Sequence, residues 1–142
     1  MIFLPLSIII DAPVEEVYEV LNKPENNNLW NPVTETVTPI SGKPNECEVK
    51  SFMGDFTTKK AAVKNKSVTI TVTGSPVLKE LKYELAELSD NQTSVDGTIT
   101  LISTANYPTI HRVVGEKLIQ NLKKFAEHIH ARLKPEDFQK EI

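Results

Sequence analysis

The chain has 142 residues, of which 39% are hydrophobic and 25% are charged, and its formal net charge is -3. These values are typical of one folded globular domain over residues 1–142, and they give no electrostatic attraction to nucleic acid or to an anionic membrane. The only cysteine, Cys47, has no second cysteine for a disulfide or a metal pair, which is typical of a protein of the reducing cytoplasm.

The first ten residues are strongly apolar, but they lack the features of a signal peptide. No Lys or Arg precedes the apolar run, no small-x-small cleavage site follows it, and Asp11 ends it before it is long enough to span a bilayer. We therefore predict a β-strand here and no integral membrane segment. Pro13 then favours a helix start, and Lys23-Pro24 ends that short helix.

Residues 33–101 alternate between apolar and polar side chains, with a turn about every ten residues. Such connections are too short for crossover helices, so we predict about six further strands in an antiparallel sheet. Asn26–Asn28 are poor helix formers, which limits a second helix before these strands to a turn or two. We interpret Gly54-Asp55 as a two-residue hairpin loop that puts Met53 and Phe56 on the same side of the sheet.

The most clearly amphipathic segment is a long helix predicted from Thr109 to Leu133. Its apolar arc covers about half of the circumference, which is wider than the stripe that a helix needs to rest on a flat surface. The arc comprises Ile110, Val114, Leu118, Ile119, Leu122, Phe125, Ala126, Ile129 and Leu133. We therefore expect a curved sheet that wraps around this helix. The polar tail, about residues 135–142, is expected to fray.

The segments Ile8 to Tyr18, Asn22 to Asn26 and Trp30-Asn31-Pro32 resemble the opening of the START-like helix-grip superfamily (SRPBCC). This superfamily includes proteins of the birch-pollen allergen type, polyketide cyclases and lipid-transfer proteins. The resemblance implies an α+β fold in which a curved antiparallel sheet of about seven strands wraps around the C-terminal helix, with two short helices between strands 1 and 2. It also implies an apolar binding cavity between sheet and helix. Lys23 departs from the Asp that members often carry there.

Three polar or small residues are candidates for the cavity wall. His111 lies in line with Leu118 on the apolar side of the last helix, where it either bonds a backbone carbonyl at the rim or contacts a ligand. Gly115 either leaves space for a ligand or allows close packing of helix and sheet. Glu35 is in phase with the inward residues of its strand, so its carboxylate either faces the cavity or lies at a solvated or bulged strand end.

The orientation of Lys60 depends on one loop length. It faces inward if counted from the hairpin at Gly54, and outward if counted back from Val68 across a two-residue turn. His128 and His130 point about 200° apart on a helix, so they do not form a metal pair, and no metal or other cofactor is predicted. The predicted pocket residues are Trp30, Glu35, Met53, Phe56, Tyr83, Ile99, His111, Gly115 and Leu118.

Three functions of different classes fit this fold. The one we favour is binding or transport of a small hydrophobic molecule, such as a lipid, an isoprenoid or an aromatic or polyketide-like metabolite, because few polar side chains face the predicted cavity. The second is an enzyme of the polyketide cyclase or dehydratase kind, with His111 and Glu35 as acid and base, although no catalytic motif is present. The third is a protein-interaction module like the chaperone activators of this fold, which would have a filled cavity and an exposed apolar patch for a protein partner.

Overall fold

The computed structural model describes residues 1–102 and 111–142, and for residues 111–113 it describes the backbone only. Within this part of the chain, seven strands form one antiparallel sheet in the order β1-β7-β6-β5-β4-β3-β2. The strands are β1 (Ile2–Ile10), β2 (Thr34–Pro39), β3 (Glu46–Ser51), β4 (Phe56–Val63), β5 (Ser67–Thr73), β6 (Leu78–Ser89) and β7 (Gln92–Leu101). The predicted antiparallel sheet is confirmed.

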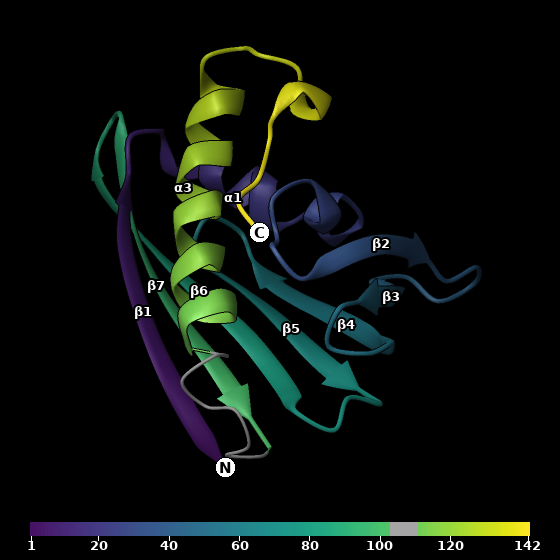
Figure 1. Cartoon of the computed structure of the whole chain (residues 1–142). Helices are drawn as coiled ribbons and strands as arrows, with labels where there is room; N and C mark the ends of the chain where they lie inside the picture. Colours follow the sequence, from purple (N-terminus) through teal and green to yellow (C-terminus); the bar gives the residue numbers. More distant parts are fainter. Residues whose placement is uncertain (103–110) are drawn as a thin grey trace.

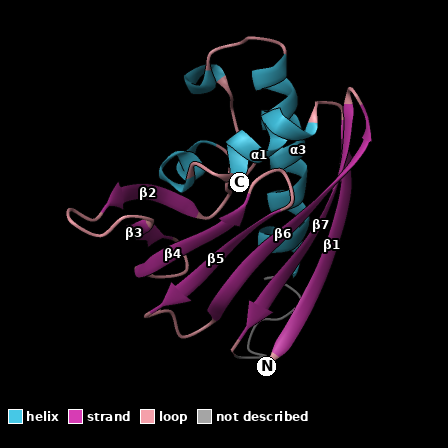
Figure 2. Cartoon of the chain, turned by 180° about the vertical axis from the view of Figure 1, so that it is seen from behind, coloured by secondary structure: helices cyan, strands magenta, loops and turns pink. Residues whose placement is uncertain are grey.

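The sheet curves around the helix α3 (Lys117–His130), as Figure 1 shows. Seen from behind, the sheet passes in front of the lower part of this helix, and β1 runs along its side (Figure 2). Two short helices lie between β1 and β2 in the chain, namely α1 (Val14–Leu21) and the 3-10 helix η1 (Pro24–Leu29). The predicted α+β helix-grip arrangement is therefore confirmed, with a sheet that wraps one long helix.

Helix α1 forms for local reasons that the sequence already shows. Pro13 precedes it with a φ of -61°, and two acidic residues lie in its first turn, where they interact favourably with the helix dipole. Its buried side chains repeat at helical spacing and face the core, namely Val14, Val17, Tyr18 and Leu21.

The C-terminal helix begins as a π-helical segment, η2 (His111–Glu116), and continues as α3. The predicted start at Thr109 lies outside the described residues. The helix ends at His130 and not at Leu133, because Arg132 adopts a left-handed φ of 63°. The amides of Arg132 and Leu133 donate to the carbonyls of Ile129 and His128, which closes the helix end as a Schellman cap.

The core fills the space between the inner face of the sheet and α3. Leu118 and Leu122 on the helix are fully buried, as are Leu4, Ile99 and Leu101 on β1 and β7. Removing this apolar surface from water provides most of the favourable free energy of folding. The wide apolar arc of the helix is thus covered by a concave sheet, as its width predicted.

The C-terminal tail does not fray as expected. After the 3-10 helix η3 (Pro135–Asp137), the chain runs back along α3, in yellow in Figure 1. The ring of Phe138 packs edge-on against Phe125, with ring centroids 5.2 Å apart. The buried side chain of Asn121 donates to the carbonyl of Glu141 at 2.8 Å and accepts from its amide at 3.1 Å. The polar composition was misleading because these polar atoms bond to α3 and not to solvent.

Candidate functional site

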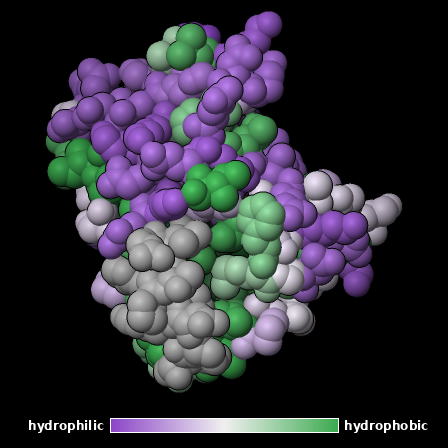
Figure 3. Space-filling model, in the orientation of Figure 1, coloured by the Kyte–Doolittle hydropathy of each residue, from purple (hydrophilic) through white to green (hydrophobic). Residues whose placement is uncertain are grey.

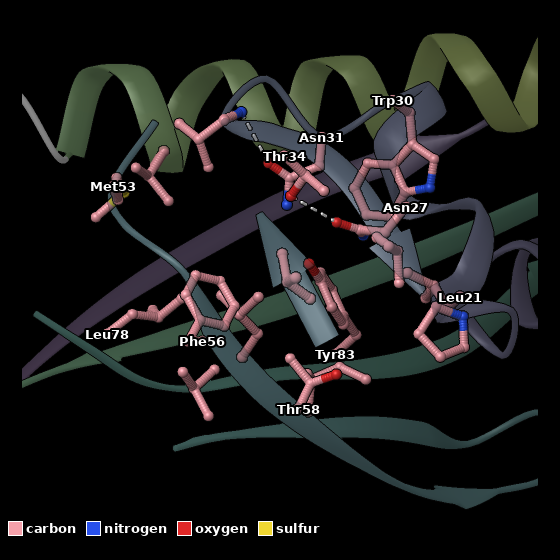
Figure 4. A pocket seen from close by; sticks show the side chains of 18 of the residues that line it. Leu21, Asn27, Trp30, Asn31, Thr34, Met53, Phe56, Thr58, Leu78 and Tyr83 are labelled. Atoms are coloured by element: carbon pink, nitrogen blue, oxygen red, sulfur yellow. Dashed lines mark hydrogen bonds between the residues drawn. The ribbon is translucent and has the colours of Figure 1, made fainter. Parts of the chain in front are cut away.

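A cavity lies between the inner face of the sheet and the segment formed by α1, η1 and the start of β2 (Figure 4). Its volume is about 40 Å³, which is room for a few water molecules at roughly 10–15 Å³ each. Sites for small organic ligands usually measure about 300–1,000 Å³. The cavity is therefore closed around a small space in this structure.

The floor of the cavity is apolar because the strands alternate. Every second residue of β3, β5 and β6 points inward, and this brings Val49, Val72 and Leu81 to the cavity. Leu21 of α1 and Val114 of η2 close it from the helical side. These side chains cannot exchange protons or form hydrogen bonds, so the walls favour apolar occupants.

Four of the predicted pocket residues line this cavity, namely Trp30, Met53, Phe56 and Tyr83. Trp30 follows η1 and Tyr83 lies on β6, and their rings meet edge to face with centroids 6.5 Å apart. Met53 and Phe56 lie at the opposite end of the cavity from Trp30 (Figure 4). The loop between them was expected to have two residues, but residues 50–55 connect the paired parts of β3 and β4.

Three other predicted pocket residues do not line the cavity. Glu35 is exposed at a β-bulge between Thr34 and Thr36, which is the solvated and bulged alternative of the sequence analysis. Ile99 and Leu118 face inward as expected, but they belong to the core between β7 and α3, with exposed fractions of 1% and 0%. The sequence pattern identified the correct face for these two residues but not their position along it.

Gly115 serves close packing and does not line the cavity. A Cβ atom at this position would come within 3.2 Å of Leu6 Cδ2, which is closer than ordinary van der Waals contact. The missing side chain therefore lets η2 approach β1. The side chain of the remaining candidate, His111, lies outside the described residues.

Lys60 faces inward, but it caps a helix. It pairs with Ile70 in the register of β4 and β5, because the loop between these strands has three residues, 64–66, and not two. Its Nζ donates to the carbonyl of Asn22 at 2.9 Å, just beyond the C-terminus of α1. A positive charge is favourable at this end of a helix. Lys60 lies outside the cavity wall, next to Cys47, whose thiol pKa is raised mainly by burial.

A polar wall, which the sequence pattern did not predict, comes from η1 and the segment that leads into β2. Thr34 Oγ1 donates to Asn27 Oδ1 at 3.2 Å, and the amide of Val33 donates to Asn31 Oδ1 at 3.0 Å (Figure 4). All four residues line the cavity. The asparagines were interpreted only as poor helix formers, although Asn side chains also hold irregular backbone by such bonds.

Two buried polar atoms of the cavity residues have no hydrogen-bond partner among the described residues. They are the hydroxyl oxygen of Tyr83 and the indole nitrogen of Trp30. Their side chains are almost fully buried, with exposed fractions of 4% and 2%. Burial raises the pKa of the Tyr83 hydroxyl, which keeps it protonated as a hydrogen-bond donor. A buried donor without a partner costs about 1–3 kcal/mol, so such groups usually have a reason.

Neither a protein-family model nor a curated protein sequence matches the chain. Solved structures do match. A START superfamily protein from Mycobacterium smegmatis aligns with a TM-score of 0.71 and 15% identity, over 89% of this chain and 98% of that one. The chain has a START-like helix-grip fold.

Two further solved structures also align with most of this chain. One domain of the di-domain ARO/CYC StfQ, from the steffimycin biosynthetic pathway, aligns with a TM-score of 0.75 and 15% identity, over 91% of this chain and 46% of that longer one. The Aha1 dimer from Colwellia psychrerythraea gives a TM-score of 0.66 and 18% identity, over 92% of this chain and 97% of that one. At these identities the likeness shows the fold alone.

The START-like fold of this chain has a brace across the cavity wall. Lys140 Nζ donates to the backbone carbonyls of Asn28, Asn31 and Thr34, at 2.8, 2.7 and 2.7 Å. Burial lowers the pKa of this amine, and the carboxylate of Glu35 opposes that shift. The tail therefore holds η1 and the start of β2 in place.

We also searched the described part of the chain for a metal site and for a membrane-spanning helix. Among these residues, no group of three His, Cys, Asp or Glu side chains is placed to hold a metal ion. No described helix is both long enough and apolar enough to cross a membrane. His130 binds the carboxylate of Glu16 through Nδ1 at 3.0 Å, on the surface between α1 and α3.

Proposed function

We propose that this chain binds a small hydrophobic molecule in the cavity between the sheet and the α1–η1 segment. The observation that carries the proposal is the composition of the wall. As far as the structure describes it, the wall is apolar apart from a few uncharged polar groups and one charged residue, Lys23. It also contains a buried Tyr83 hydroxyl that has no partner among the described residues. Ligand sites commonly combine an apolar lining with a few polar groups in this way.

The small volume means that a ligand must move part of the wall. Met53 and Phe56 are only partly buried, and Met53 lies in the connection between β3 and β4. A methionine side chain is unbranched and adapts its shape at low cost. We therefore infer that the Met53 end of the cavity widens when a molecule enters, while the strands below keep their positions.

The enzyme alternative requires Glu35 and His111 to act as an acid–base pair in the cavity, and Glu35 does not meet this requirement. Glu35 is exposed at a bulge and is not among the residues that line the cavity. A general base must come within hydrogen-bond reach of its substrate. Among the described residues, no carboxylate lines the cavity, so we do not propose acid–base catalysis there.

The protein-interaction alternative requires a contiguous exposed apolar patch besides a nearly filled cavity. Over α3 and the tail, the surface in Figure 3 is mainly hydrophilic, with single hydrophobic side chains between. On β1, the exposed Phe3 and Ile9 are separated by the exposed Ser7. The small cavity fits this alternative, but Phe3 and Ile9 do not form one continuous patch along β1.

A ligand panel with a blocked variant tests the proposal. The purified chain, stripped of bound lipid, is incubated with fatty acids, methyl ketones, isoprenoid alcohols and aromatic compounds. We expect a one-to-one complex in native mass spectrometry and a higher unfolding temperature for at least one class. Val49→Phe fills the cavity and should abolish both effects, whereas Val63→Phe, on the exposed part of β4, should not. No complex and no thermal shift with any compound would overturn the proposal.

A further inference from the structure

We infer that the cavity selects an uncharged apolar molecule with one carbonyl oxygen, which accepts a hydrogen bond from the Tyr83 hydroxyl. This inference rests on the proposed binding function and names the ligand class. It begins with the position of Tyr83. The side chain rises from β6 into the cavity, and Figure 4 shows its oxygen directed toward the space below Asn31 and Thr34.

The polar groups nearest in Figure 4 are already engaged with one another. Asn27 Oδ1 accepts from Thr34, and Asn31 Oδ1 accepts from the amide of Val33. Tyr83 has no such partner among the described residues. A ligand oxygen between the sheet and this wall would therefore meet a free donor.

A carbonyl fits this donor better than a hydroxyl does. A carbonyl oxygen accepts the hydrogen bond and brings no donor of its own into an apolar space. A ligand hydroxyl would also accept it, but its own hydrogen would then need an acceptor. Asn27 Oδ1 and Asn31 Oδ1 each accept one hydrogen bond already, so a ligand hydroxyl would have to share one of them, whereas a ketone, aldehyde or ester needs no acceptor.

The electrostatics at Tyr83 disfavour a charged head group. Burial raises the pKa of Tyr83, and among the described lining residues only Lys23 could serve as a counter-ion. A carboxylate placed against the hydroxyl would thus be buried without a counter-ion, which is costly. Lys23, the one charged residue among the described lining residues, belongs to the rim. It is half exposed there, and its Nζ lies 4.0 Å from Glu19 Oε2.

The indole nitrogen of Trp30 does not share this oxygen. In Figure 4 it lies on the edge of the ring that faces away from Tyr83. One ligand oxygen therefore satisfies Tyr83 alone.

The experiment compares three ligands of equal length, a methyl ketone, an alkane and a fatty acid, on the native chain and on Tyr83→Phe. The variant removes one oxygen atom from the cavity. We expect the native chain to bind the ketone about five- to tenfold more tightly than the alkane, which is the usual worth of one hydrogen bond. In Tyr83→Phe this preference should disappear. Tyr18→Phe, at a buried tyrosine that does not line the cavity, should retain it.

The infrared band of a ketone with a 13C-labelled carbonyl gives a readout that does not depend on affinity. The band should lie at lower wavenumber in the native complex than in the Tyr83→Phe complex, because a hydrogen bond weakens the C=O bond. In addition, the unfolding temperature of ligand-free Tyr83→Phe should equal or exceed that of the native chain, since the variant removes an unpaired buried group.

The outcomes separate this inference from the proposed function. If ketone and alkane bind equally to both proteins, the cavity binds ligands but Tyr83 does not select them. If the fatty acid binds most tightly and loses affinity in Lys23→Gln but not in Tyr83→Phe, the polar end lies at the rim and the inference is wrong. If none of the three ligands binds and Tyr83→Phe is less stable than the native chain, the hydroxyl holds water, and both proposals fail for these ligands.

Discussion

Lys140 Nζ lies 2.7 Å from the carbonyl oxygen of Thr34, although 106 positions separate the two residues in the chain. This bond and its two companions to Asn28 and Asn31 join the tail to the segment that forms the polar wall of the cavity. The wall therefore depends on a residue that sequence patterns assign to no element of secondary structure.

Lys140→Met should destabilise the protein by about 1–3 kcal/mol, because three backbone carbonyls lose a charged donor at once. Urea unfolding measures the change. Lys124→Met is the matched control, since Lys124 is exposed on α3, and it should change the stability by less than about 0.5 kcal/mol. Equal stabilities of the two variants would mean that the brace contributes nothing to the fold.

The packing of the sheet against α3 can be tested with substitutions at two leucines of the C-terminal region. Leu122 is completely buried, whereas Leu133 is 54% exposed beyond the helix end. Leu122→Ala should cost about 2–5 kcal/mol through lost burial and the cavity that it leaves, and Leu133→Ala should be close to neutral. Chemical denaturation of both variants gives the comparison. A neutral Leu122→Ala would contradict the architecture itself.

The close contact between Gly115 and Leu6 predicts that Gly115→Ala has opposite effects on stability in two proteins, the native chain and the Leu6→Ala variant. In the native chain, Gly115→Ala places a methyl group against Leu6 Cδ2 and should be destabilising or neutral. Combined with Leu6→Ala, the same change should stabilise by up to about 1 kcal/mol, because alanine is the better helix former. Unfolding free energies of the four proteins form a double-mutant cycle. If Gly115→Ala changed the stability equally in both proteins, the contact with Leu6 would not be the reason for a glycine at this position.

Tyr83 predicts a loss of stability at alkaline pH. Burial raises its pKa above the ordinary tyrosine value of about 10, so the folded state keeps the proton after the unfolded state has lost it. The free energy of unfolding therefore falls as the pH rises above about 10, by roughly 1.4 kcal/mol per pH unit for this group. Tyr83→Phe should lose less stability than the native chain between pH 8 and pH 11 in urea titrations. Parallel losses in the two proteins would show that the hydroxyl ionises as freely in the folded state.

The sequence predicted the fold because alternation and turn spacing are local properties. Met53, Phe56 and Tyr83 were assigned to the inner face by counting along strands, and the structure places all three at the cavity. The same counting failed for Glu35, since a β-bulge shifts the phase of the strand and leaves no mark in the residue pattern.

Position along the sheet was harder to predict than the face. Ile99 on β7 and Leu118 on α3 both point into the core, and their distance from the cavity depends on where the helix crosses the sheet. The polar wall around Asn31 was missed for another reason. An asparagine in a loop is equally compatible with solvent and with a buried hydrogen bond, and only the folded chain distinguishes the two.

The brace at Lys140 also means that the cavity wall is not self-sufficient. η1 and the start of β2 are held by a side chain that belongs neither to the sheet nor to α3. A proteolytic cut between α3 and Lys140 would leave every strand and the long helix in place, but the wall above Tyr83 would lose its anchor.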